Sequence, residues 1–174
     1  SDGIDDVIIS GRSGQLLAIN GLNGSLIWDY FPYSSNPSDS GVYNFYNPQF
    51  IGDVDGDSYD DILISNGGDH AAPSFQTNRP PGHLMVVSSL TGNLIVKAVV
   101  PDSSETYCSP IVADIQNDGN LWVLYGTGGE NLGGNFYAAL LSDLLLGDLS
   151  SSIILESDPN KGYIAPASVY QNPN

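Results

Sequence analysis

Basic residues, cysteine and long apolar stretches are all scarce in this chain of 174 residues. Four Lys and Arg stand against twenty Asp and Glu, which gives a formal net charge of −16. A surface of that sign repels nucleic-acid phosphates and anionic lipids, so nucleic acid is not an expected partner. No apolar run approaches the roughly 18 residues that a transmembrane helix needs. With one cysteine, Cys108, an internal disulfide is excluded and the redox compartment stays undetermined.

The composition is nevertheless that of a folded protein. Hydrophobic residues make up 41% of the chain and charged residues 14%, which is too apolar for intrinsic disorder. Many of the carboxylates lie close together in the sequence, where bound cations would offset their repulsion. Composition therefore favours a globular, acidic protein that holds a divalent metal.

Internal repeats organise the sequence. DGIDDVIIS at residues 2–10 and DSYDDILIS at residues 57–65 share five identical positions, and a weaker copy, DIQNDGNLWVLYG, begins at Asp114. LLAINGLNGSLIW at residues 16–28 likewise matches LMVVSSLTGNLIV at residues 84–96. Each of these two segments joins two β-rich runs through a short turn that contains glycine, which is typical of a hairpin. The repeat unit therefore predicts four short strands.

A unit of about 60 residues with four strands has the size of a β-propeller blade. We predict an all-β fold whose blades of four antiparallel strands form an incomplete ring of about two and a half to three blades. The predicted blades are residues 1–46, which lack a first strand, residues 47–104 and residues 105–160, and residues 161–174 start the next. A closed ring needs at least about four blades, so the remainder is expected from the same or another chain. Residues 142–149 are compatible with one short helical turn.

The segment DVDGDSYDD, residues 53–61, has the spacing of a calcium loop. Its predicted ligands are the carboxylates of Asp53, Asp55, Asp57 and Asp61 and the backbone carbonyl of Tyr59. Calcium takes roughly six to eight oxygen ligands, and alternate residues of a tight loop point inward to supply them. Gly56 permits the sharp turn. Ile64 stands where an EF-hand needs a bidentate Glu, so the prediction is a calcium turn between two strands.

The other two copies retain part of this pattern. The first keeps Asp2, the carbonyl of Ile4 and Asp6, which predicts a partial site that upstream residues would complete. The third keeps Asp114 and Asp118 but has Gln116 and Trp122 at two other ligand positions. A metal-free turn is the favoured interpretation of the third copy.

These copies resemble FG-GAP repeats, the calcium-loop blades of the integrin α-subunit head and of many secreted bacterial proteins. DVDGDSYDDILIS resembles that motif position by position, SDGIDDVIIS resembles its second half, and DIQNDGNLWVLYG resembles a degraded form. The turns in LNGSLIW and LTGNLIV also resemble those of quinoprotein-type propellers. The resemblance implies a propeller with structural calcium and a secreted or cell-surface location, but it does not fix an activity.

Strand connectivity predicts that the long connections lie opposite the calcium loop. The calcium loop joins the first two strands of a blade and the hairpin turn joins the last two, so both open at one end. The opposite end carries residues 31–47 and 66–82, which are longer than most connections in compact domains. Candidate ligand-binding residues there are Tyr33, Tyr43, Phe45, Tyr46, His70 and Arg79. The aromatic rings suit stacking on a glycan or protein and equally suit packing on a neighbouring blade.

The charged candidates in the second long connection have simpler interpretations. For Arg79, a salt bridge to the acidic body is favoured over a carboxylate-bearing ligand. His70 has no recognised metal-ligand spacing to the other histidine, and packing or hydrogen bonding within the loop is favoured.

Two functions remain as alternatives. The calcium loop, the acidic charge and the lack of a catalytic motif favour a secreted or cell-surface calcium-binding propeller. It would be a non-catalytic scaffold or a module that binds proteins or glycans. The alternative is part of a propeller enzyme, either a polysaccharide lyase or a quinone-dependent dehydrogenase, whose ring-centre residues come largely from other blades.

Overall fold

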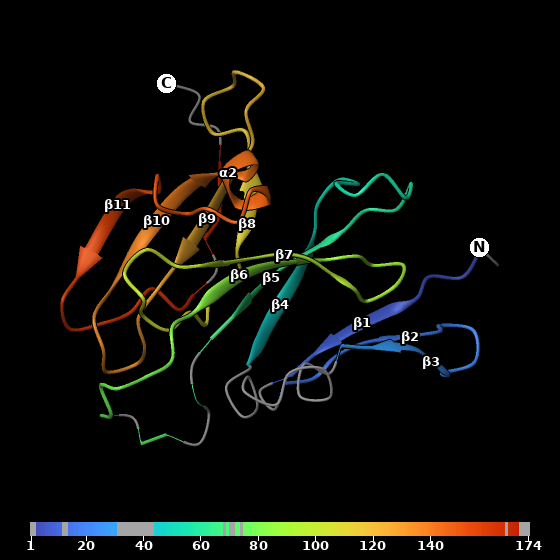
Figure 1. Cartoon of the computed structure of the whole chain (residues 1–174), viewed down its shortest axis with the longest axis horizontal. Coiled ribbons are helices and arrows are strands. Elements are labelled where there is room, and N and C mark those ends of the chain that lie inside the picture. Colours follow the sequence, from blue (N-terminus) through green and yellow to red (C-terminus); the bar gives the residue numbers. More distant parts are fainter. Residues whose placement is uncertain are drawn as a thin grey trace.

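The structure is a computed structural model that describes residues 3–11, 14–30, 44–67, 69, 72–73, 75–165 and 167–170. These residues form eleven β-strands and one short helix. The strands make three antiparallel sheets that follow one another along the chain and fan out side by side (Figure 1). The predicted all-β architecture, an incomplete propeller of successive blades, is confirmed.

Each sheet is a meander in which every strand pairs with its neighbour in the sequence. The first sheet contains β1 (Val7–Ser10), β2 (Leu16–Ile19) and β3 (Leu26–Asp29). The second contains β4 (Phe45–Phe50), β5 (Ile62–Asn66), β6 (His83–Val87) and β7 (Leu94–Val99). The third contains β8 (Ile111–Ala113), β9 (Trp122–Gly126), β10 (Gly134–Leu140) and β11 (Ile153–Asp158).

The second sheet is packed on both of its faces. On β5, Ile62 and Ile64 belong to a core cluster with Trp28 of the first sheet. Leu63, between them, belongs to a second cluster with Tyr125 of the third sheet. Because successive residues of a strand point to opposite faces, one apolar strand supplies both interfaces. The cores of this molecule therefore lie between its sheets.

A short helix, α2 (Leu141–Leu145), occupies the β10–β11 connection, where one helical turn was predicted. Its buried residues Leu141 and Leu144 join the cluster between the second and third sheets, and the helix contacts β7. The chain leaves the helix through Gly147, whose φ of +76° suits glycine. No helix in the described ranges is long and apolar enough to cross a bilayer.

The segment that follows β11 lies within residues 161–174, where the sequence predicts the start of a further blade. Gly162 and Tyr163 donate backbone hydrogen bonds to the carbonyls of Gly129 and Thr127, so the chain runs along the third sheet. Its described residues nevertheless form no strand. A blade's first strand needs the second strand of the same blade as a hydrogen-bonding partner, and that strand is not among the described residues.

Candidate metal site

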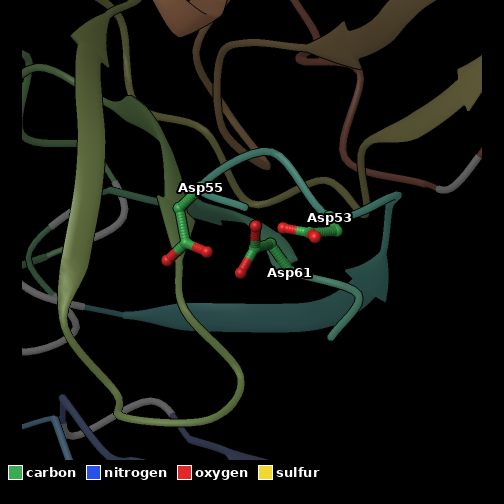
Figure 2. Close-up of side chains that lie close together, drawn as sticks. All are labelled: Asp53, Asp55 and Asp61. Atoms are coloured by element: carbon green, nitrogen blue, oxygen red, sulfur yellow. The ribbon is translucent and has the colours of Figure 1, made fainter. Parts of the chain in front are cut away.

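Three carboxylates of the predicted calcium loop converge just before β5. Single oxygens of Asp53, Asp55 and Asp61 all lie within 4.8 Å of one another. Figure 2 shows the three side chains turned toward one small space between the β4–β5 loop and the start of β5. This is the one group of three or more His, Cys, Asp or Glu side chains with metal-ligand spacing in the part of the chain that the structure describes.

Backbone hydrogen bonds to Asp53 organise the loop. Its carboxylate accepts bonds from the N–H groups of Gly56 (2.6 Å), Asp57 (3.2 Å) and Ser58 (2.9 Å). The bonds from Ser58 and then Gly56 lower the pKa of Asp53 most. Gly56 (φ +87°) and Ser58 (φ 76°) both adopt the left-handed conformation that closes the turn. The loop thus presents Asp53 as an ionised carboxylate at its centre.

Asp61 provides independent evidence for a cation. Its side chain is 0% exposed, and Oδ2 accepts a hydrogen bond from the N–H of Val54 (2.9 Å). No described residue donates to its Oδ1. Burial raises the pKa of Asp61, against the effect of the Val54 bond. A buried acceptor without a donor costs about 1–3 kcal/mol, and more when charged. A cation held with Asp53 and Asp55 would satisfy this oxygen, so the three aspartates fit a metal ion.

Asp57, a predicted ligand, lies outside the three-aspartate cluster. Its Oδ1 accepts a hydrogen bond from the N–H of Tyr59 (2.9 Å), and its Oδ2 accepts one from Ser88 Oγ (3.4 Å). The predicted ligand at Tyr59 is its backbone carbonyl, and the residue itself is 47% exposed. The structure therefore directs the Asp57 carboxylate toward the β6–β7 turn, which begins at Ser88.

The first copy of the loop has no such convergence at its described residues. Asp2 lies outside them, and Ile4 and Asp6 are exposed. Asp6 Oδ1 accepts a hydrogen bond from the N–H of Gly21 (3.0 Å) in the hairpin turn of the same sheet. The predicted partial site therefore remains a prediction.

The third copy keeps the loop conformation with fewer carboxylates. Asp114 accepts hydrogen bonds from the N–H groups of Asp118 (3.2 Å) and Gly119 (2.9 Å), as Asp53 does from the corresponding residues of the second loop. Asp118 accepts two bonds from Asn120, which lower the pKa of Asp118. Asp114 thus performs the folding role of Asp53, and no third acid side chain joins the pair among the described residues.

Packing accounts for the two described aromatic candidates at the opposite end of the blades. The side chain of Phe45 is 2% exposed and meets Tyr30 edge to face, with ring centroids 5.7 Å apart. Tyr46 meets Tyr107 in the same way at 5.4 Å. Tyr33, Tyr43 and His70 lie outside the described residues. Of the two alternatives for these rings, packing on neighbouring structure is the one observed for Phe45 and Tyr46.

Arg79 forms the salt bridge that its sequence context favoured. Its Nη1 lies 3.1 Å from Glu105 Oε2, and the two side chains are 9% and 2% exposed. The same guanidinium donates to the carbonyls of Asp69, Pro73 and Gln76. Arg79 thus organises the described part of the 66–82 connection through these hydrogen bonds, and its salt bridge to Glu105 joins that connection to the third repeat.

Glu105 is the buried acid that the sequence did not reveal. Burial raises its pKa, Arg79 opposes the rise, and Asp69 adds to it. Tyr107 also donates to its Oε2. Glu105 stands alone in PDSSETY, without a repeat partner or ligand spacing, so no local signal marks it.

Comparison with protein-family models, with curated proteins and with solved structures found no match to this chain. The fold and the site define an acidic protein of stacked antiparallel sheets, whose described residues include a three-aspartate cluster that could bind a metal ion. Any more specific function rests on the chemistry of these residues.

Proposed function

We propose that this chain is a calcium-binding part of an FG-GAP-type β-propeller. In this proposal the protein is secreted or displayed at the cell surface and acts as a non-catalytic scaffold or a module that binds proteins or glycans. The observation that carries the metal assignment is Asp61 Oδ1, which is buried, belongs to one of the three clustered carboxylates and receives no hydrogen bond from any described residue.

Calcium suits the donor set better than other common metals do. The cluster offers carboxylate oxygens, which hard cations prefer, and contains none of the thiolate or imidazole ligands typical of zinc sites. Calcium accepts roughly six to eight oxygens in flexible geometry, so backbone carbonyls and water can complete its shell. Magnesium demands near-octahedral geometry at about 2.0–2.1 Å and retains several waters.

Exposed apolar residues on the first sheet support a further blade as a partner. Val7 and Ile9 are 50% and 41% exposed, whereas their counterparts in the second repeat, Ile62 and Ile64, are 0% exposed. Ile62 and Ile64 are covered by the first sheet. By analogy, another blade of the same protein or of another chain would cover Val7 and Ile9, as ring completion requires.

Isothermal titration calorimetry tests the calcium assignment. After treatment with EDTA, the protein should bind calcium at one site and prefer it to magnesium. Asp61→Asn and Asp55→Asn should lose this binding, whereas Asp118→Asn, which removes an exposed acid from the third loop, should retain it. Calcium binding by Asp61→Asn with wild-type affinity, or no binding by the wild type, would contradict the assignment.

The non-catalytic part of the proposal has a separate test. The purified protein should leave anionic polysaccharides uncleaved and reduce no quinone, while an array of glycans and surface proteins should reveal a ligand. Turnover by a homogeneous sample would favour the propeller enzyme instead. This part rests on analogy with the fold, which hosts many activities.

A further inference from the structure

We propose that metal binding in the second sheet also tightens the contact between the first and second sheets, through the β6–β7 turn and Trp28. The inference rests on the proposed metal site at Asp53, Asp55 and Asp61, and it adds a second effect of that site. The ion would brace its own loop and, through the turn, the neighbouring sheet as well.

The first link joins the acidic loop to the turn. The N–H of Asp57 donates to Asp53 Oδ1 (3.2 Å) and Asp55 Oδ1 (3.1 Å), so its backbone is tied to two of the clustered carboxylates. Its own carboxylate accepts the hydrogen bond from Ser88 Oγ (3.4 Å). Ser88 is 2% exposed. If Asp53 and Asp55 rearrange around an ion, Asp57 should therefore move with them. The carboxylate of Asp57 is the group that accepts the hydrogen bond from the buried Ser88 hydroxyl.

The second link makes the turn move as a unit. Ser88 Oγ accepts a bond from the N–H of Thr91 (3.3 Å) while it donates to Asp57. The Ser88 N–H donates to the carbonyl of Asn93, and the Gly92 N–H donates to the carbonyl of Ser88, both at 2.9 Å. Because the hydroxyl and the backbone of Ser88 both hold residues 88–93, a displacement of its side chain is transmitted to the whole turn.

The third link joins the turn to the first sheet. Trp28 of β3 donates from Nε1 to the carbonyl of Ser89 (2.8 Å). Its ring lies so close to Gly92 that a Cβ there would stand 2.7 Å from ring atoms. Trp28 is 8% exposed and belongs to the core cluster between the two sheets. Figure 2 shows the turn, in yellow-green, between the three aspartates and the blue strands of the first sheet.

The first sheet shows that contact between loop and turn recurs in the repeat. There Asp6, the counterpart of Asp61, accepts a hydrogen bond from Gly21 in the hairpin turn of its own sheet. Asn20, the counterpart of Ser88, accepts bonds from the N–H groups of Leu22 and Asn23 through its side chain. A polar side chain at the start of the turn therefore accepts bonds from backbone N–H groups of the turn in both sheets, and the link to the acidic loop is made by the Gly21 N–H in one sheet and by the Ser88 hydroxyl in the other.

Hydrogen exchange with mass spectrometry measures the proposed coupling in the unaltered protein. Calcium should slow amide exchange in residues 88–93 and also in β3, by roughly 2- to 10-fold, the equilibrium equivalent of one hydrogen bond. A second readout uses Trp122→Phe, which leaves Trp28 as the single tryptophan. Calcium should then reduce acrylamide quenching of its fluorescence.

Two neighbouring serines supply the test variant and its matched control. Ser88→Ala should bind calcium in calorimetry but lose the calcium effect on β3, because the hydroxyl bond to Asp57 is gone. Ser89→Ala should keep the effect, because Ser89 contributes its backbone carbonyl to Trp28. Calcium binding without slower exchange in β3 would overturn the coupling and leave the metal site intact. An unchanged response in Ser88→Ala would overturn the route through Ser88. Failure of calcium to bind at all would instead refute the proposed function on which the coupling rests.

Discussion

Replacement of Asp61 by Asn tests the metal site with a very small change of shape. The amide oxygen can still accept the hydrogen bond from Val54 that Asp61 Oδ2 accepts in the wild type. What disappears is one negative charge at a position that is 0% exposed, together with an oxygen to which no described residue donates. The variant therefore separates the role of the charge from that of the side-chain volume.

The expected magnitude follows from linkage. A ligand at about 100 times its Kd that binds only the folded state stabilises it by roughly 2.7 kcal/mol. In a chain of this size, each kcal/mol corresponds to about 2–4 °C in Tm. Calcium should thus raise the Tm of the wild type by about 5–11 °C and that of Asp61→Asn by little. In EDTA, Asp61→Asn should have a higher Tm than the wild type, because a buried neutral amide costs the folded state less than a buried carboxylate without a counter-ion.

Differential scanning calorimetry in EDTA and in excess calcium measures both effects, with Asp118→Asn as the control. Asp118 lies in the third loop, so its variant should keep the calcium-dependent rise. A full rise of Tm in Asp61→Asn would refute the metal assignment. An equal loss of stability with and without calcium would also refute it, because the carboxylate would then have a purely structural role.

Three further predictions concern the loop, the turn and the buried acid. Ser58→Gly should raise the free energy of unfolding by about 0.5–1 kcal/mol in urea titrations, because φ at Ser58 is 76° and glycine adopts it without strain. Gly92→Ala should lower Tm more than Gly24→Ala, since both have positive φ but Gly92 alone abuts Trp28; equal losses would deny a role to that contact. Burial raises the pKa of Glu105 above its ordinary value of 4.5, so the folded state holds this proton more tightly than the unfolded state does. The free energy of unfolding of the wild type, measured relative to Glu105→Gln, should therefore fall as the pH rises through the folded-state pKa of Glu105. Urea titrations in EDTA at several pH values measure this difference. A difference that does not change with pH would show that Glu105 does not titrate.

The sheets could be predicted because their signals are local. The repeated segment at residues 57–65 leads into β5 (Ile62–Asn66), and the matched segments at residues 16–28 and 84–96 each form a hairpin. Alternation of apolar residues and a glycine in each turn are enough to specify these pairs. The first strand of a further blade within residues 161–174 could not be predicted in this way, because its formation depends on a partner strand rather than on its own composition.

In the candidate site, too, contacts between residues close in the sequence could be predicted, and contacts between distant residues could not. Asp53, Asp55 and Asp61 lie within nine residues, so the conformation of one loop brings them together and their spacing predicted it. The bond from Ser88 to Asp57 joins residues 31 positions apart, and that from Arg79 to Glu105 joins residues 26 apart. Such pairs are set by the packing of the sheets, and no repeat or spacing in the sequence records them.

The three copies of the acidic loop separate loop folding from metal binding. Gly3, Ser58 and Gly119 occupy the same repeat position and have φ values of +80°, 76° and +86°. The positive φ at this position is therefore shared, and the third loop, with Trp122 in place of Asp61, still closes around its first aspartate. Hydrogen bonds from two backbone N–H groups to Asp114 accompany that closure. What the second loop has in addition is a buried Asp61 in a sheet whose described residues are packed on both faces, next to the turn that contacts Trp28. An ion bound at the proposed site would accordingly stabilise the position of this loop between two sheets as well as the loop itself.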